Sequence, residues 1–182
     1  MAVTLIRNVG LMLSGDVQAP ILDADSLVIQ GGTIQEIGKE LGAPSGAVVI
    51  DAGGCAVCPG LIDSHCHVVL GDYTPRQQMQ SFLESSVHGG VTTSISAGEV
   101  HLPGRPKDPA GTKALAILAA KAWANFRPGG MKILGGAVIL EKGLTEADFD
   151  EMAREGIKVV GEIGLGSVKD PDEAATMCDW AK

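Results

Sequence analysis

The chain has 182 residues, of which 45% are hydrophobic and 20% are charged, and this composition is typical of a folded globular protein. Its formal net charge of -8 argues against nucleic acid and against an anionic membrane as partners, because both require a basic surface. The N-terminus has no apolar core followed by a cleavage site, and the longest apolar run, 114–120, is too short to span a bilayer. We therefore expect a cytoplasmic protein.

The first 57 residues show strand patterns and no helical periodicity. We predict four short strands, at 4–9, 26–30, 33–37 and 47–51, with Gly31-Gly32 as a hairpin turn. Four short strands bury too little surface to fold alone, so residues 1–57 are interpreted as the N-terminal part of a small β-sandwich domain. Cys55 and Cys58 end this unit without a second cysteine pair. We expect two buried, unreactive thiols there rather than a zinc ribbon or a redox motif.

From residue 58 the sequence alternates between strand and helix patterns, which is typical of a parallel sheet. We predict strands at 61–67, 91–97, 131–140 and 157–163, and helices at 74–88, 112–126, 145–155 and from 170 to the last residue. Four parallel strands fit either a complete doubly wound domain or half of an eight-stranded barrel. The last helix has no stop signal, and this favours the second alternative. The predicted fold class is α/β, with 58–182 as the first four βα units of a truncated (β/α)8 barrel.

The segment 59–67, Pro-Gly-Leu-Ile-Asp-Ser-His-Cys-His, places two histidines near the end of a strand. Side chains of a strand alternate between its faces, so His65 and His67 share one face, with Cα atoms about 7 Å apart. Two imidazoles at that spacing can bind one ion. Two histidines in this pattern are commonly unrelated, but the C-terminal end of a parallel strand is where α/β folds place their chemistry.

Glu162 lies near the end of an otherwise apolar strand, where an unpaired carboxylate is costly to bury. A salt bridge to a buried lysine or a partly exposed strand end would also explain it. In a barrel, however, the first and fourth strands end at the same mouth, so Glu162 could reach an ion that His65 and His67 hold. Nitrogen and oxygen ligands suit zinc, iron, manganese or cobalt, and the ligand types do not choose among them.

The segment 59–67 after a small β unit resembles the metal-dependent amidohydrolase superfamily. Further segments resemble the enamidase branch of that superfamily, and these are 71–77, 88–93, 103–108, 135–145 and 161–166. The resemblance implies a distorted (β/α)8 barrel, a two-metal centre of zinc and iron, and a homo-oligomer, a tetramer in this branch. It also implies ring opening of a cyclic amide, 6-oxo-tetrahydronicotinate, to 2-formylglutarate and ammonia.

By the same resemblance His65 and His67 would hold the first metal, and Glu162 would bridge it to the second. Two further histidine ligands and a proton-transferring aspartate belong to later strands, beyond Lys182. We therefore interpret the sequence as an N-terminal fragment and expect it to be inactive by itself.

A substrate that carries a carboxylate needs a cationic partner near the metal. The candidates are Arg105 and Lys107, in the Gly/Pro-rich loop 98–111, and Tyr73 and Arg76, after the first strand. Solvated surface charge is an equally good explanation for Arg76. The loop 98–111 is also a candidate substrate lid.

Two alternatives remain open at this point. Another cyclic amidohydrolase, such as a dihydropyrimidinase, a hydantoinase or an imidazolonepropionase, would share the histidine pair. A carboxylated lysine on the fourth strand would favour the dihydropyrimidinase branch, but Glu162 stands where that bridging ligand is expected. A non-catalytic metal-binding half-domain is the second alternative, and its open strand edges argue against it.

Overall fold

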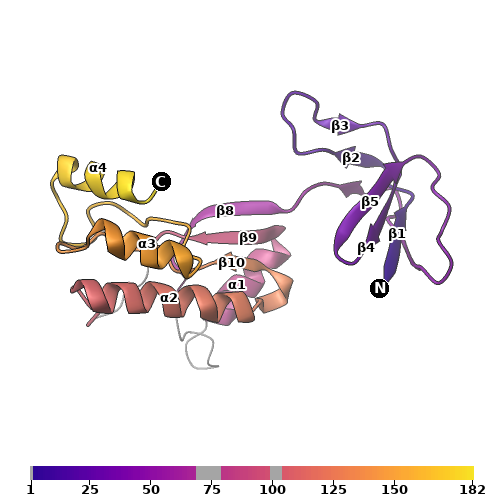
Figure 1. Ribbon diagram of the computed structural model, residues 1–182. Coiled ribbons are helices and arrows are strands. Elements are labelled where there is room, and N and C mark those ends of the chain that lie inside the picture. The colour runs from indigo at the N-terminus through magenta and orange to yellow at the C-terminus, as the bar shows by residue number, and fades with distance from the viewer. Residues whose placement is uncertain (1, 69–78, 99–103) are drawn as a thin grey trace. The chain divides into compact units, whose positions relative to one another are not determined.

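The computed structural model describes residues 2–68, 79–98 and 104–182 (Figure 1). The chain divides into two compact units, Met1–Pro59 and Gly60–Lys182. Each unit has its own hydrogen-bonded sheets and its own apolar core. Among the described residues, none of the helices is both long enough and apolar enough to cross a bilayer.

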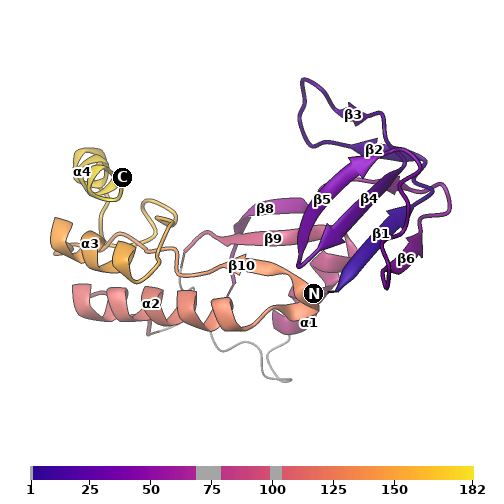
Figure 2. The ribbon, with the colours of Figure 1, turned by 45° about the vertical axis from the view of Figure 1, so that its right-hand side comes forward.

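The first unit contains two small sheets, which Figure 2 shows. The larger has the strand order β5 (Thr33–Gly38), β4 (Ser26–Gln30), β1 (Val3–Arg7) and β6 (Val48–Asp51). The smaller has the order β3 (Ile21–Leu22), β2 (Leu11–Leu13) and β7 (Ala56–Val57). The larger sheet consists of the four predicted strands. The smaller sheet was not predicted, because strands of two or three residues are too short to show an alternating pattern.

The predicted hairpin turn joins β4 to β5. Gly31 and Gly32 have φ angles of 60° and 80°, a left-handed conformation that a two-residue turn between antiparallel strands requires. Cys55 and Cys58 flank β7 and are exposed, so the prediction of buried thiols was wrong. β7 is the edge strand of the smaller sheet, and its short length leaves the residues on either side of it in solvent.

The second unit contains a parallel sheet with the order β10, β9, β8. Its elements along the chain are β8 (Leu61–Cys66), α1 (Met79–His88), β9 (Val91–Ser96), α2 (Pro109–Asn125), the 3-10 turn η1 (Pro128–Gly130), β10 (Lys132–Leu134), α3 (Glu146–Arg154) and α4 (Pro171–Trp180). Both ribbon views show α2 running along the sheet. Leu83 of α1 and Trp123 of α2 pack against Cys66 and Val68, so the C-terminal end of β8 is anchored in the core.

Helix α2 begins earlier than the predicted residue 112. Asp108 is its N-cap: the Oδ1 atom accepts a hydrogen bond from the Gly111 N–H at 2.9 Å, and Pro109 occupies the first turn. The predicted helix at 74–88 is described only as α1, and residues 74–78 lie outside the described part. Helix α4 ends at Trp180, and the Ala181 N–H closes its last turn on the Met177 carbonyl at 3.2 Å.

The third and fourth predicted strands are less regular than expected. β10 ends at Leu134, because Gly135 packs under the Trp123 ring and Gly136 takes a φ of 84°. Beyond this break, one isolated parallel bridge joins Val138 to Val160. The three-stranded sheet therefore stays open, and the described residues contain no closed barrel.

Helices α2 and α3 are joined by ionic contacts around Asp148, at the start of α3. Its Oδ1 atom lies 2.8 Å from the Lys113 Nζ of α2. Its Oδ2 atom accepts hydrogen bonds from the N–H and the hydroxyl of Thr145, at 2.7 and 2.8 Å. The hydrogen bond from Lys113, together with the Thr145 donors, lowers the Asp148 pKa against the opposing effect of burial. Asp148 is thus both the capping-box residue of α3 and its tie to α2.

We predict that Asp148→Asn destabilises the protein at pH 7 but not in acid. Because the folded-state pKa is lowered, the stabilisation is present above the ordinary aspartate pKa and is lost as the pH falls through the folded value. Urea unfolding should show a loss of about 1 kcal/mol at pH 7, allowing for solvent screening, and a shrinking difference below about pH 4. Asp150→Asn, at an exposed neighbour, is the control. An equal loss of unfolding free energy at pH 7 and below about pH 4 would contradict the prediction.

Candidate metal centre

His65, in strand β8, and His67, directly after its end, lie on the side opposite the core. Cys66 and Val68 are buried, whereas the His65 side chain is 59% exposed and the His67 side chain is 36% exposed. The alternation predicted for this segment is therefore present at its C-terminal end. Cys66 packs in the core on the other side, where burial raises the pKa of its thiol.

Asp63 supports the backbone that carries the histidines. The register between β8 and β9 is irregular between Asp63 and Cys66. At this irregularity the Asp63 Oδ1 atom accepts a hydrogen bond from the His65 N–H at 3.0 Å. The carboxylate thus holds the backbone of His65 where the strand pairing is interrupted.

Glu162 reaches the histidines from the segment that pairs with Val138. Its N–H donates a hydrogen bond to the Ala97 carbonyl, just after β9, at 2.7 Å. The preceding Gly161 lies against the same backbone: a Cβ atom there would come 2.7 Å from the Ala97 oxygen and 2.8 Å from the Gly98 Cα. A side chain at 161 would prevent this approach, so the glycine allows Glu162 to lie beside β8.

The three side chains meet. The Glu162 Oε1 atom lies 2.9 Å from the His65 Nε2, and its Oε2 atom lies 3.8 Å from the His67 Nε2. The two imidazole rings have centroids 5.1 Å apart and are nearly perpendicular. One ligand atom from each residue lies within 4.8 Å of the others.

This geometry fits a metal ion. Zinc–nitrogen and zinc–oxygen bonds of about 2.1 Å place tetrahedral ligands about 3.4 Å apart. Small rotations of three half-exposed side chains would bring the ligand atoms from the observed spacing to that value. Two imidazole nitrogens and one carboxylate oxygen also form a donor set that zinc and iron accept. In the described part of the chain, this is the one cluster of ligand-type side chains with such spacing.

The predicted substrate residues lie in different situations. Tyr73 and Arg76 fall outside the described residues, as does the 99–103 part of the candidate lid. Lys107 is exposed. The Arg105 side chain is only 10% exposed, and its Nη2 atom lies 2.7 Å from the Glu141 Oε1. Among the predicted residues, the structure therefore brings together the three candidate metal ligands, and it pairs Arg105 with a carboxylate that sequence reasoning missed.

Glu141 has a fully buried side chain directly after the apolar run 137–140. Its Oε1 atom accepts from Arg105, and its Oε2 atom accepts from the Ser167 N–H at 2.8 Å. Burial would raise the Glu141 pKa, but hydrogen bonds from Ser167 and the charge of Arg105 outweigh this effect and lower it. The signal available in the sequence was a single carboxylate closing an apolar run, the same signal that pointed to Glu162.

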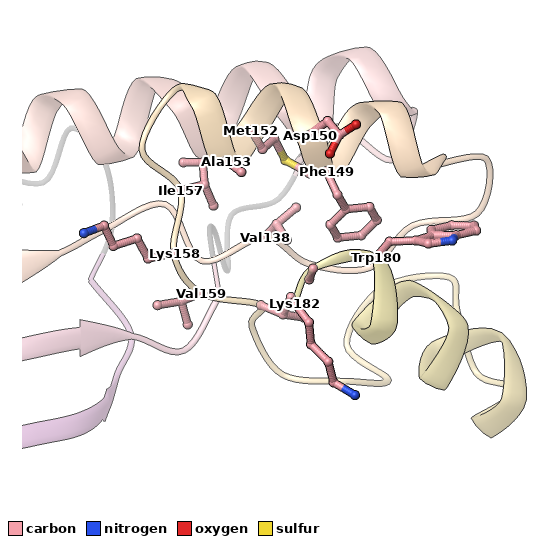
Figure 3. Close-up of a pocket in the computed structure, with 12 residues that line it drawn as sticks. Val138, Phe149, Asp150, Met152, Ala153, Ile157, Lys158, Val159, Trp180 and Lys182 are labelled. Atoms are coloured by element: carbon pink, nitrogen blue, oxygen red, sulfur yellow. The ribbon is translucent and has the colours of Figure 1, made fainter.

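A separate pocket of about 310 Å³ lies between α3, the segment 157–160 and the end of α4 (Figure 3). The rings of Phe149 and Trp180 line one side of it, with centroids 6.1 Å apart. The lining includes none of the three metal ligands, so this pocket is distinct from the metal centre.

Comparison with known proteins identifies the class. No family model matches the chain. A D-hydantoinase of Geobacillus stearothermophilus is 33% identical over 167 residues, which are 91% of this chain and 31% of that protein. A solved structure described as a new member of the amidohydrolase superfamily superimposes on 99% of this chain with a TM-score of 0.91 and 55% identity. The chain therefore belongs to the amidohydrolase superfamily.

That solved structure is an enamidase, and this chain covers 47% of it. The enamidase of Eubacterium barkeri is 56% identical over 183 residues, a match that includes all of this chain. The chain spans about half the length of that relative, 47%. The similarity thus extends through both units and includes the segments that carry His65, His67 and Glu162.

We predict that metal binding depends on all three ligands. His65→Ala and Glu162→Ala should each lower the bound zinc or iron to well below one equivalent, because removing one of three protein ligands typically costs about tenfold or more in affinity. Elemental analysis after dialysis measures this. His88→Ala and Glu146→Ala, at exposed helix positions, are the matched controls. Unchanged metal content in both ligand variants would reject the assignment.

Gly161→Ala tests the backbone approach that places Glu162. The added methyl group would overlap the backbone of Ala97 and Gly98, so we expect a loss of about 2 kcal/mol in unfolding free energy and weaker metal binding. Gly42→Ala is the control, because a Cβ there has open space. Full metal content with unchanged stability would show that the close contact is not required.

Proposed function

We propose that this chain forms the N-terminal part of a longer metal-dependent amidohydrolase of the enamidase type. Such an enzyme opens the ring of 6-oxo-tetrahydronicotinate and gives 2-formylglutarate and ammonia. The observation that carries the proposal is the 56% identity to enamidase along the whole of this chain. The cluster of His65, His67 and Glu162 supports it independently, because it supplies the donors that a hydrolytic metal needs.

In this proposal each ligand has a defined role. His65 and His67 hold the first metal, and Glu162 bridges it to a second. We propose zinc and iron, with manganese or cobalt as alternatives, since imidazole and carboxylate suit all four. When bound, such ions polarise an amide carbonyl and lower the pKa of water. The aspartate that transfers the proton and the remaining ligands would come from later strands, so these 182 residues alone would not turn over substrate.

The architecture proposed for the longer protein is a (β/α)8 barrel beside a small β-sandwich, and in solution a homo-oligomer. The open parallel sheet of β8, β9 and β10 supports a barrel that further strands complete. Ile62 and Ile163, on the two segments that carry the ligands, are 65% and 59% exposed. Burying such side chains stabilises a fold by about 2 kcal/mol each, and the second half of a barrel would cover them.

A hydantoinase-type activity is the second candidate. The D-hydantoinase of Geobacillus stearothermophilus matches 91% of this chain, although at 33% identity. Both candidates hydrolyse a cyclic amide, so the histidine pair does not separate them. Glu162, which we assign to the bridging position, is a carboxylate rather than a carboxylated lysine, and this favours the enamidase type.

The substrate assignment is tested by ring opening of three cyclic amides, measured as ammonia release for 6-oxo-tetrahydronicotinate and as the N-carbamoyl product for dihydrouracil and hydantoin. We predict that the longer protein, loaded with zinc and iron, releases ammonia from 6-oxo-tetrahydronicotinate at least tenfold faster than it opens dihydrouracil or hydantoin. Product analysis by NMR should identify 2-formylglutarate, and Glu162→Ala is the inactive control. Activity on dihydrouracil and hydantoin alone would reject the enamidase assignment and favour the second candidate.

A further inference from the structure

We infer that Glu141 is a positioning residue that holds the Arg105 guanidinium for the carboxylate of the substrate. This inference rests on the proposed function, because it names the group that recognises the acidic substituent of the ring. The observation that leads to it is a buried ion pair at the chemically active edge of the sheet.

The pair is unusually well enclosed. The Glu141 side chain is fully buried, and the Arg105 side chain is 10% exposed. Desolvating two charges costs about as much as their attraction returns, so an ion pair of this kind contributes little to stability compared with apolar side chains of the same size. Stability therefore does not account for this pair. Its full set of hydrogen bonds serves instead to hold the positive charge of Arg105 in one position.

Glu141 is itself held on both oxygens. Arg105 donates to Oε1 at 2.7 Å, and the Ser167 N–H donates to Oε2 at 2.8 Å. The Ser167 hydroxyl oxygen in turn accepts a hydrogen bond from the Lys142 N–H at 2.8 Å. These bonds keep the carboxylate ionised and fix its direction, so Arg105 meets a rigid partner.

The pair lies at the same edge of the sheet as the metal ligands. Arg105 is in the connection that follows β9, and Glu141 ends the segment that pairs, at Val138, with the segment of Glu162. A Cβ atom at Gly98 would lie 3.1 Å from the side chain of Ile139, two residues before Glu141, and Glu162 donates to the neighbouring Ala97 carbonyl. The connections after parallel strands form the substrate-binding edge of α/β folds.

The chemistry suits a carboxylate ligand. A guanidinium has five N–H donors in a planar fork and binds carboxylates in a bidentate manner. Glu141 accepts from Nη2 of Arg105, and the Pro106 carbonyl accepts from Nη1 at 3.4 Å. These two acceptors orient the plane of the guanidinium, and its remaining donors can meet a second carboxylate. The exposed Lys107 adds positive charge in the same connection.

Calorimetry with nicotinate and nicotinamide tests the inference without turnover, because these rings differ in the carboxylate alone. The longer, metal-loaded protein should bind nicotinate more tightly than nicotinamide. Glu141→Gln, which keeps the shape but loses the charge, should raise the nicotinate Kd about tenfold and leave the nicotinamide Kd unchanged. Arg105→Lys should also raise the nicotinate Kd about tenfold and leave the nicotinamide Kd unchanged. The double variant should bind nicotinate no more weakly than Arg105→Lys alone, because both substitutions act through the Arg105 guanidinium. Glu146→Gln is the matched control.

Kinetics supply the second readout. In Glu141→Gln the KM for 6-oxo-tetrahydronicotinate should rise about tenfold, whereas kcat and the KM for the same lactam without its carboxylate should stay unchanged. Equal changes for both ligands, or additive effects in the double variant, would show that Glu141 is structural and overturn the inference. If Glu141→Gln does not fold, unchanged nicotinate binding by Arg105→Lys overturns it. A protein that prefers nicotinate but releases no ammonia would reject the proposed function and leave the inference standing.

Discussion

The candidate centre depends on one backbone hydrogen bond, from the Glu162 N–H to the Ala97 carbonyl. Ala97 follows β9, the middle strand of the parallel sheet, and β8 with the histidines is its neighbour. The bond therefore brings a carboxylate from a distant segment to the strand next to the histidines. Gly161 permits this contact because it has no Cβ atom to meet the backbone of Ala97 and Gly98. A carboxylate and two imidazoles then lie within reach of one ion.

The same edge of the sheet carries a second charged group with a different purpose. At the candidate metal ligands the side chains are one third to about three fifths exposed, and such exposure would allow water and a small molecule to reach a bound ion. At Glu141 and Arg105 both side chains are enclosed, and each hydrogen bond fixes a direction. The proposed function would use both environments, an open one for the metal and a rigid one to recognise a carboxylate.

Local sequence patterns predicted the regular elements well. The hairpin at Gly31-Gly32, the strands β4 and β9 and the helix α3 agree with the predicted ranges to within one or two residues. The misses have physical causes. The smaller sheet of the first unit has strands too short for a pattern, and the segment 135–140 leaves the sheet because two glycines allow the chain to bend beneath Trp123. Apolar runs predict burial there, but they do not predict pairing.

The sequence by itself determined that His65 and His67 share one face of a strand, because alternation follows from the backbone of a single segment. It also marked Glu162 as a carboxylate near the end of an apolar strand, without deciding which cation it meets. Only the tertiary structure made that choice: it placed Glu162 beside the histidines and Glu141 beside Arg105. Contacts between distant segments depend on how closely their backbones can approach, and the residue pattern of a single segment does not specify that distance.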